Sequence, residues 1–376
     1  MQKKTARLCW FSVALVVALV SLLAWLIASQ IVSRQSGALR TATALPARTG
    51  QKMEPLGDGV VYTDGTTLHA LNGKGLQIWS YAAGSGSSFS VGKGGVAAWQ
   101  SRTLSLLTGD QGVPLYNSTM ENTIVDARMD TQYAAVQVLA NRTNAQGGAQ
   151  SPSEHNSVML ILEHGGRQVD RIELPNQTVL DFGFFYNGSL FWVMSMDTEG
   201  TVPMCSISTY KPGKMLAGTI TDSQQVLYEV LFQSSKIRAV GTTHIKDFDY
   251  TSRELTEDRL LVYGWYLMDL DDDADNPLMA FVPVAQAESG QIQDVRMIRG
   301  QTDHPVRLPY ASSRVFARDD TIYAFTNQYV SMCRLGQTTP ETYAMPIYVD
   351  DVVGITKDHQ AIVSSGGVMY LVPLLR

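Results

Sequence analysis

Hydrophobic and polar residues follow two different patterns along the chain, and the change between them falls near residue 34. The first pattern is a single apolar run from Leu8 to Ser33, which contains no acidic or basic residue. As a helix, this run is long enough to cross a hydrocarbon core of roughly 30 Å, and a helix satisfies its own backbone hydrogen bonds inside lipid. We therefore expect a transmembrane helix over residues 8–33.

The charges beside this run predict its orientation. Three basic residues lie within residues 1–7, and basic residues favour the cytoplasmic side, so we expect a cytoplasmic N-terminal tail and a single-pass protein of the cell membrane whose remainder is extracytoplasmic. Arg34 and Arg40 on the other side weaken this asymmetry. The alternative is a cleaved signal peptide with Ala42-Thr43-Ala44 as its small-x-small site. That site lies well past the apolar run, which favours an uncleaved anchor.

The second pattern consists of short apolar runs that are separated by turns. Residues 34–56 are polar and interrupted by prolines, which is typical of a juxtamembrane spacer. From Gly57 onward, runs of β-branched and aromatic residues alternate with turn dipeptides such as Asp64-Gly65 and Asn72-Gly73, which supply the positive φ angles of tight hairpins. The pattern predicts an all-β domain over residues 57–376.

The same strand-turn-strand unit recurs, and one glycine marks its turn in each copy. These glycines are spaced by 37, 54, 47, 77 and 46 residues, mostly near the roughly 40–50 residues of a four-stranded propeller blade: Gly75, Gly112, Gly166, Gly213, Gly290 and Gly336. We interpret the polar stretches Asn141–Asn156 and Thr219–Glu257 as loop insertions. The result is a propeller of about seven blades, with a β-sandwich as the second choice.

The ring is expected to close through its last blade. The final copy, from Asp351 to Val372, contains three strands. A strand from the start of the domain would complete it, because closing the ring in this way removes exposed sheet edges.

Two of the repeats carry a more specific motif. The segment from Ala70 to Trp79 resembles the repeat A-x-D-x-x-T-G-x-x-x-W, although Asn72 replaces the acid and the segment is one residue shorter because the threonine is absent. The spacing from Gly112 to Tyr116 repeats that from Gly75 to Trp79. The chain thus resembles the bacterial membrane-anchored PQQ-like (quinoprotein-dehydrogenase-like) β-propellers of uncharacterised function, which are similar in architecture to WD40 propellers. The resemblance implies an architecture and not an activity.

Composition narrows the choice of partners and of stabilising bonds. The whole chain carries −6, and its first fifty residues carry +6, so residues 51–376 carry −12. An acidic domain is a poor match to nucleic acid or to anionic lipid headgroups. Only Cys205 and Cys333 lie beyond the apolar run, too few for a disulfide framework, and no C-x-x-C pair suggests zinc.

One acidic stretch stands out as a candidate metal site. Alternate carboxylates at Asp269, Asp271, Asp273 and Asp275 resemble the start of a D-x-D-x-D calcium loop, because carboxylate oxygens on a loop can surround a hard cation. The glycine of such loops is replaced by Ala274, and Ala280 stands at the position of the closing acid. A solvated acidic loop without a metal is the alternative. We expect no other cofactor.

These observations predict a membrane-tethered extracytoplasmic propeller that binds or scaffolds a protein or a cell-surface polymer without catalysis. The loops 141–156 and 265–277 are the first candidates for contact, since long loops on a rigid scaffold carry function. The alternative is a quinoprotein-like or lactonase-like enzyme with calcium or a cofactor in the central funnel. A sensor is a third possibility, although seven residues are too few for a cytoplasmic output domain.

Overall fold

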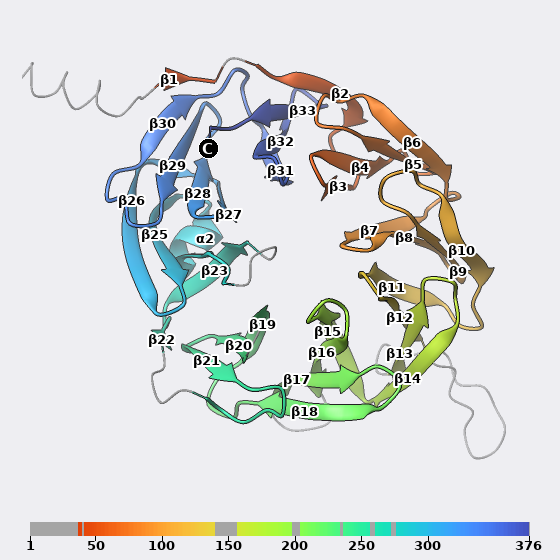
Figure 1. Cartoon of the computed structure of the whole chain (residues 1–376). Helices are drawn as coiled ribbons and strands as arrows, with labels where there is room; N and C mark the ends of the chain where they lie inside the picture. Colours follow the sequence, from red (N-terminus) through yellow and green to blue (C-terminus); the bar gives the residue numbers. More distant parts are fainter. Residues whose placement is uncertain are drawn as a thin grey trace, which may run out of the picture.

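The strands form a closed ring of eight blades around a common axis (Figure 1). The computed structural model describes residues 37–39, 41–139, 156–197, 204–233, 236–255, 260–271 and 276–375. Within these ranges the chain forms 33 strands and one helix of six residues, α2 (Val284–Ser289). The predicted all-β propeller is confirmed, but the expected number of about seven blades is wrong.

Each of the first four blades is an antiparallel meander whose first strand lies nearest the axis (Figure 1). Blade 1 contains β3 (Met53–Leu56), β4 (Gly59–Thr63), β5 (Thr67–Leu71) and β6 (Gln77–Ala82). Blade 2 contains β7 (Ser88–Gly92), β8 (Gly95–Gln100), β9 (Thr103–Leu107) and β10 (Pro114–Thr119). Blade 3 contains β11 (Ile124–Met129), β12 (Tyr133–Leu139), β13 (Asn156–Glu163) and β14 (Gln168–Pro175). Blade 4 contains β15 (Gln177–Phe185), β16 (Leu190–Asp197), β17 (Met204–Lys211) and β18 (Met215–Thr221).

The remaining blades repeat this plan with changes at the end of the ring. Blade 5 contains β19 (Leu227–Gln233), β20 (Lys236–Gly241), β21 (His244–Phe248) and β22 (Leu260–Leu261). Blade 6 contains β23 (Trp265–Leu270), β24 (Met279–Pro283), β25 (Ile292–Arg299) and β26 (Thr302–Ser312). Blade 7 contains β27 (Arg314–Arg318), β28 (Thr321–Phe325), β29 (Tyr329–Arg334) and β30 (Glu341–Ala344), with β1 (Gly37–Ala38) as a fifth strand. Blade 8 contains β31 (Asp351–Ile355), β32 (Gln360–Ser365), β33 (Val368–Pro373) and β2 (Thr43–Arg48).

The ring closes as expected, through an early strand that completes a three-stranded last blade. β2 pairs antiparallel with β33 and forms the outer edge of blade 8. Leu45 and Ala47 are buried in this strand while Pro46 is exposed, and an edge strand tolerates a proline because its outer side needs no donor. β1, β2 and β3 all lie inside residues 34–56, so the propeller begins earlier than the predicted boundary at Gly57.

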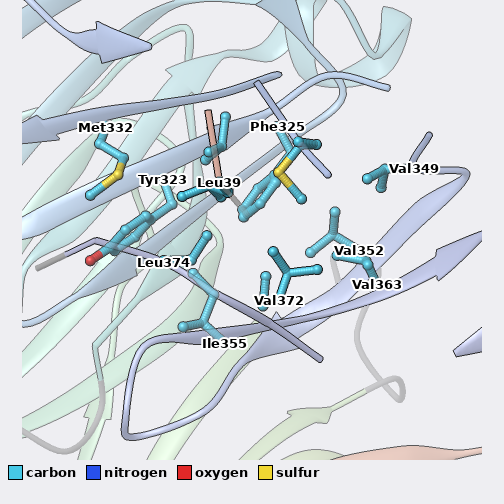
Figure 2. Close-up of a cluster of buried hydrophobic side chains, with 13 residues drawn as sticks. Leu39, Tyr323, Phe325, Met332, Val349, Val352, Ile355, Val363, Val372 and Leu374 are labelled. Carbon is cyan, nitrogen blue, oxygen red and sulfur yellow. The ribbon is translucent and has the colours of Figure 1, made fainter. Parts of the chain in front are cut away.

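The joint between blades 7 and 8 also holds the start of the described chain. β1 pairs parallel with β30, and the residue that follows it, Leu39, is buried with Tyr323 and Phe325 of blade 7 and with Val363 and Val372 of blade 8 (Figure 2). Burial of large apolar side chains is the main favourable term in such a joint. The N-terminal segment therefore contributes to the core of the ring.

The blade that the glycine spacing missed is blade 5. Its first three strands fall inside the stretch Thr219–Glu257, which the sequence suggested to be a loop insertion, and β22 lies just beyond it. The turn between its last two strands has Ser252 in the positive-φ conformation (φ 70°), a conformation that glycine adopts more easily. In blade 6 the corresponding turn residue is Gly300, whereas Gly290 ends helix α2. When Ser252 is counted as the turn residue of blade 5 and Gly300 as that of blade 6, the spacing after Gly213 becomes 39 and then 48 residues.

The predicted membrane anchor is not among the residues that the structure describes. The predicted tail 1–7 and the predicted span 8–33 both lie outside the described residues. Within the part of the chain that the structure describes, no helix has the length and the apolar character needed to cross a bilayer.

Candidate functional site

The first strands of the blades surround a central channel and run in the same direction. Between β7 and β11, Ser90 Oγ donates to the Ala127 carbonyl, and Gly92 packs so closely on Met129 that a Cβ there would lie 1.9 Å from its carbonyl oxygen, so the contacts advance in the same direction along both strands. Between β3 and β7, the Glu54 carboxylate accepts from Val91 N at 2.7 Å. Asp269 likewise accepts from Ala317 N at 2.7 Å. Residue order along each inner strand therefore gives the depth in the channel.

Four consecutive inner strands, those of blades 3 to 6, repeat one local device. Each contains a β-bulge, where one extra residue interrupts the pairing, and an acidic residue directly follows it. The four acids are Asp126, Asp181, Glu229 and Asp269. The first three accept the backbone N–H of the next residue at 2.8 to 2.9 Å, and Asp269 accepts one from blade 7. Each carboxylate thus accepts a hydrogen bond from a backbone N–H near a bulge, where the hydrogen bonding between the two strands is interrupted.

Arg128 links two of these acids across blades 3 and 4. Its Nη1 lies 2.6 Å from Asp181 Oδ1 and donates to the Phe182 carbonyl, its Nε lies 3.5 Å from Asp126 Oδ2, and its guanidinium lies over the Phe182 ring at 4.7 Å. Burial raises the pKa of Asp126 above its ordinary value, and nearby Asp181 adds to this, while Arg128 and Lys52 offset part of the rise. The channel between blades 1 and 4 therefore has a paired, charged wall.

A cavity of about 660 Å³ opens where the inner strands of blades 2 to 6 end. Its wall comes from the ends of β7, β11, β15, β19 and β23 and from the turns that follow the first three of them. The volume lies in the range of ordinary ligand sites, roughly 300–1,000 Å³. Because five blades contribute, the cavity is the mouth of the central channel and not a crevice within one blade.

Aromatic rings form one side of this mouth, at the joint of blades 4 and 5. Phe185 stacks on Phe232 with ring centroids 4.0 Å apart, and Trp192 contacts Phe232 at 5.2 Å. Tyr186 is 56% exposed and meets the edge of Tyr250. Aromatic side chains with one exposed face are frequent anchors in protein interfaces. Arg128 and Lys93 supply positive charge on the other side of the mouth.

The structure describes two of the four carboxylates of the predicted metal site, Asp269 and Asp271. Asp273 and Asp275 lie outside the described residues. Asp271 is buried, pairs with Arg318 Nη1 at 3.1 Å and accepts from Asp319 N at 2.7 Å, so it fastens blade 6 to blade 7, as the bond from Asp269 to Ala317 also does. These contacts are structural uses of the two carboxylates. Calcium binding at this stretch stays a prediction.

The structure describes the two loops that were predicted to make contact only in part. Most of 141–156 lies outside the described residues, and the stretch 265–277 contains β23 and the end of the cavity wall at Leu270 and Pro277. Sequence reasoning missed the aromatic mouth and three of the four acids that follow the bulges, and it singled out Asp269 for a different reason. The four acids do carry a signal, an apolar pair followed by an acid at 124–126, 179–181, 227–229 and 267–269.

Comparisons with known proteins add the fold and little else. No family model and no curated protein matches the chain. Similar solved structures include BamB from Moraxella catarrhalis, with a TM-score of 0.54 and 11% identity over 90% of this chain and 97% of that chain. They also include Sqt1 from Saccharomyces cerevisiae (0.55, 11%, 92% and 100%) and the C-terminal WD40 domain of Sif2 (0.58, 10%, 90% and 99%). At such identities the likeness shows a β-propeller fold, while the resemblance to PQQ-like proteins stays a prediction.

Proposed function

We propose that this protein is a membrane-tethered, extracytoplasmic β-propeller that binds a segment of another protein, without catalysis, at the mouth of its central channel. The tether is the apolar run 8–33, and the short stretch to β1 keeps the ring near the bilayer. The observation that carries the proposal is the cavity of about 660 Å³, which five blades build together.

The composition of the mouth suits a peptide segment. Its aromatic side offers large rigid rings around Tyr186, which lose little conformational entropy on binding, and its other side offers the cations Lys93 and Arg128. Turn backbone from β7–β8, β11–β12 and β15–β16 adds polar groups that can bond to a peptide. The wall stands on closed blades, so little reorganisation opposes binding.

Site-specific photocrosslinking in the full-length chain tests the mouth. A benzoylphenylalanine at Tyr186 is expected to give one discrete crosslinked product in native membranes. The matched control places the same group at Met215, which is 74% exposed on the outer strand β18. Equal products from both positions, or none from Tyr186, would refute binding at the mouth.

The tether has a separate test. The full chain should stay in the membrane pellet after an alkaline wash, and protease added to spheroplasts should digest the propeller. A propeller that is protected in intact spheroplasts and cut only after lysis would place it on the cytoplasmic side. A chain released by the wash would exclude the anchor.

A further inference from the structure

The inner strands present a second feature, at the end of the channel opposite the cavity. In five of them the extra residue of the β-bulge is apolar, and these five residues form what we call the collar: Val125, Leu180, Tyr228, Met268 and Val353. The inner strand of a blade has no partner on its channel side. Along an inner strand, side chains alternate between the two faces that pack on the neighbouring blades. A bulge residue interrupts this alternation, so its side chain projects towards the axis.

Exposure of the collar supports this direction. Val125, Leu180 and Val353 are 44%, 46% and 44% exposed, and both neighbours of Val353 in the chain are buried. Tyr228 stacks on Tyr266, which is 47% exposed, with ring centroids 5.7 Å apart. Tyr228 and Met268 are half-buried and also pack on the cores between blades, so three of the five collar side chains are exposed. Three exposed apolar side chains on inner strands are a larger feature than isolated surface residues, which need no explanation.

The collar is the outer of two levels in the channel. In four blades the next residue inward is the acid that follows the bulge, so Asp126, Asp181, Glu229 and Asp269 lie one step deeper than the collar. The cavity lies further along, since its wall begins at Arg128, Phe182, Val230 and Leu270 on the same strands. A group entering from the collar end meets apolar side chains first and carboxylates second.

We infer that the collar receives a basic, apolar segment of a partner protein, with a lysine or arginine side chain reaching the carboxylates below. A long basic side chain matches both levels, because its aliphatic stem packs on apolar surface while its charged end reaches polar groups. The complementarity of charge also fits the −12 carried by residues 51–376. This surface is distinct from the mouth where the proposed function places its partner.

The arrangement of the acids favours a cation at this level. Arg128 lies 3.5 Å from Asp126 and 2.6 Å from Asp181, so one cation is shared by two carboxylates and a net negative charge remains on the three groups. An entering ammonium or guanidinium group is attracted to this charge. Binding through this level should therefore weaken as salt rises.

Peptide binding to the full-length chain in nanodiscs of neutral lipid tests the inference. The probe is acetyl-Gly-Ser-Leu-Lys-Leu-Ser-Gly-amide, measured by calorimetry at low salt. Two further peptides separate the two levels of the channel, one with glutamate in place of lysine and one with serine in place of both leucines. Both are expected to bind at least tenfold more weakly than the probe.

Variants locate the binding. Leu180→Ser should weaken probe binding roughly tenfold, whereas Leu76→Ser, which alters a 62% exposed leucine in the turn before β6, should leave it unchanged. Asp181→Asn should weaken it severalfold, and Asp110→Asn removes one exposed charge elsewhere as its control. A thermal melt of each variant verifies the fold.

Two results would overturn the inference. One is equal binding of the lysine and glutamate peptides. The other is an equal loss in Leu180→Ser and Leu76→Ser, which would indicate general attraction of a cation to an acidic surface. Neither result bears on crosslinking from Tyr186, so the collar and the mouth can fail separately.

Discussion

The joints between blades are built in two ways in this ring. In blades 1 to 3 an aromatic side chain of one blade packs on a turn glycine of the next: Trp79 lies against Gly112 and donates to the Gly109 carbonyl at 2.9 Å, and Tyr116 lies against Gly166. A Cβ at Gly112 would lie 2.6 Å from the indole, so only glycine permits this approach.

In blades 5 to 8 charged side chains connect neighbouring blades instead. Arg238 and Asp247, both almost fully buried, pair at 2.7 Å within blade 5, and Arg238 Nη1 donates to the Gly300 carbonyl of blade 6 at 2.9 Å. Further round, Asp271 pairs with Arg318, whose Nη2 donates to the Ile355 carbonyl of blade 8. The comparison shows that one packing problem has an apolar and an ionic solution, and only the first is visible as a sequence motif.

The largest effect is expected from breaking the ionic joint. Arg238→Ala removes the main partner of the buried Asp247 carboxylate and leaves Lys236, at 2.5 Å, as its remaining ionic partner among the described residues. Removing one member of a buried pair typically costs about 3–5 kcal/mol, because the other charge stays buried. Chemical denaturation should show a loss of this size.

Replacing both members is the control for that experiment. The double variant Arg238→Met with Asp247→Leu removes both fully buried charges and leaves Lys236, which is 26% exposed and can turn to solvent. Such replacements are often neutral. We expect it to recover most of the stability that Arg238→Ala loses. A double variant as unstable as the single one would show that the hydrogen bond to Gly300 holds the joint, and not the ion pair.

The same contrast explains what could be predicted from the sequence. Blades 1 and 2 were recognisable because glycine and aromatic residues have fixed spacing there, and closure followed from counting the final strands. Blade 5 was missed because Lys236, Arg238, Lys246 and Asp247 gave its segment the polarity of a solvated loop, whereas the structure buries three of the four. Its turn has Ser252 where a glycine was counted elsewhere. Burial of a charge depends on its partner, which pattern alone cannot supply.

The candidate site was less accessible to prediction for a similar reason. The mouth combines Arg128, Tyr186 and Phe232 from three blades, and residues far apart in the chain come together only when the blade number is known. The acidic stretch at Asp269–Asp275 was noticed because its members are adjacent. Two of those residues bind the next blade, which shows that a dense local pattern can serve the ring itself.

The apolar joint should break with a somewhat smaller effect. Gly112→Ala places a methyl group against Trp79 at a residue whose φ is 64°, so steric overlap adds to the cost of a left-handed conformation. We expect a loss of about 2–4 kcal/mol in denaturant unfolding. Gly336→Ala is the matched control, since that turn glycine has φ 92° and no atom near its Cβ position. A similar loss in both variants would assign the effect to backbone strain alone.

Acid should weaken the ionic joint selectively. Burial acts to raise the pKa of Asp247, but the hydrogen bonds and charges of Arg238 and Lys236 outweigh it and hold the pKa below its ordinary value. A group with a lowered folded pKa contributes stability above its unfolded pKa, about 3.9, and loses it as the pH falls through the folded value. Melting temperature should therefore drop less between pH 5 and pH 3 in the Arg238→Met, Asp247→Leu variant. An equal drop in both proteins would remove this pair from the acid response.

The smallest effect is expected from Trp79→Phe, which keeps an aromatic ring at the first joint but loses the bond from Nε1 to the Gly109 carbonyl. A single hydrogen bond contributes about 0.5–1.5 kcal/mol, and a loss near 1 kcal/mol should appear in denaturant unfolding. Tyr116→Phe, which keeps its ring against Gly166, should change less. Combining Trp79→Phe with Gly112→Ala closes a double-mutant cycle. Because the smaller ring leaves room for the methyl group, the combined loss should be less than the sum of the two single losses, and strict additivity would mean that the indole and the glycine do not form one joint.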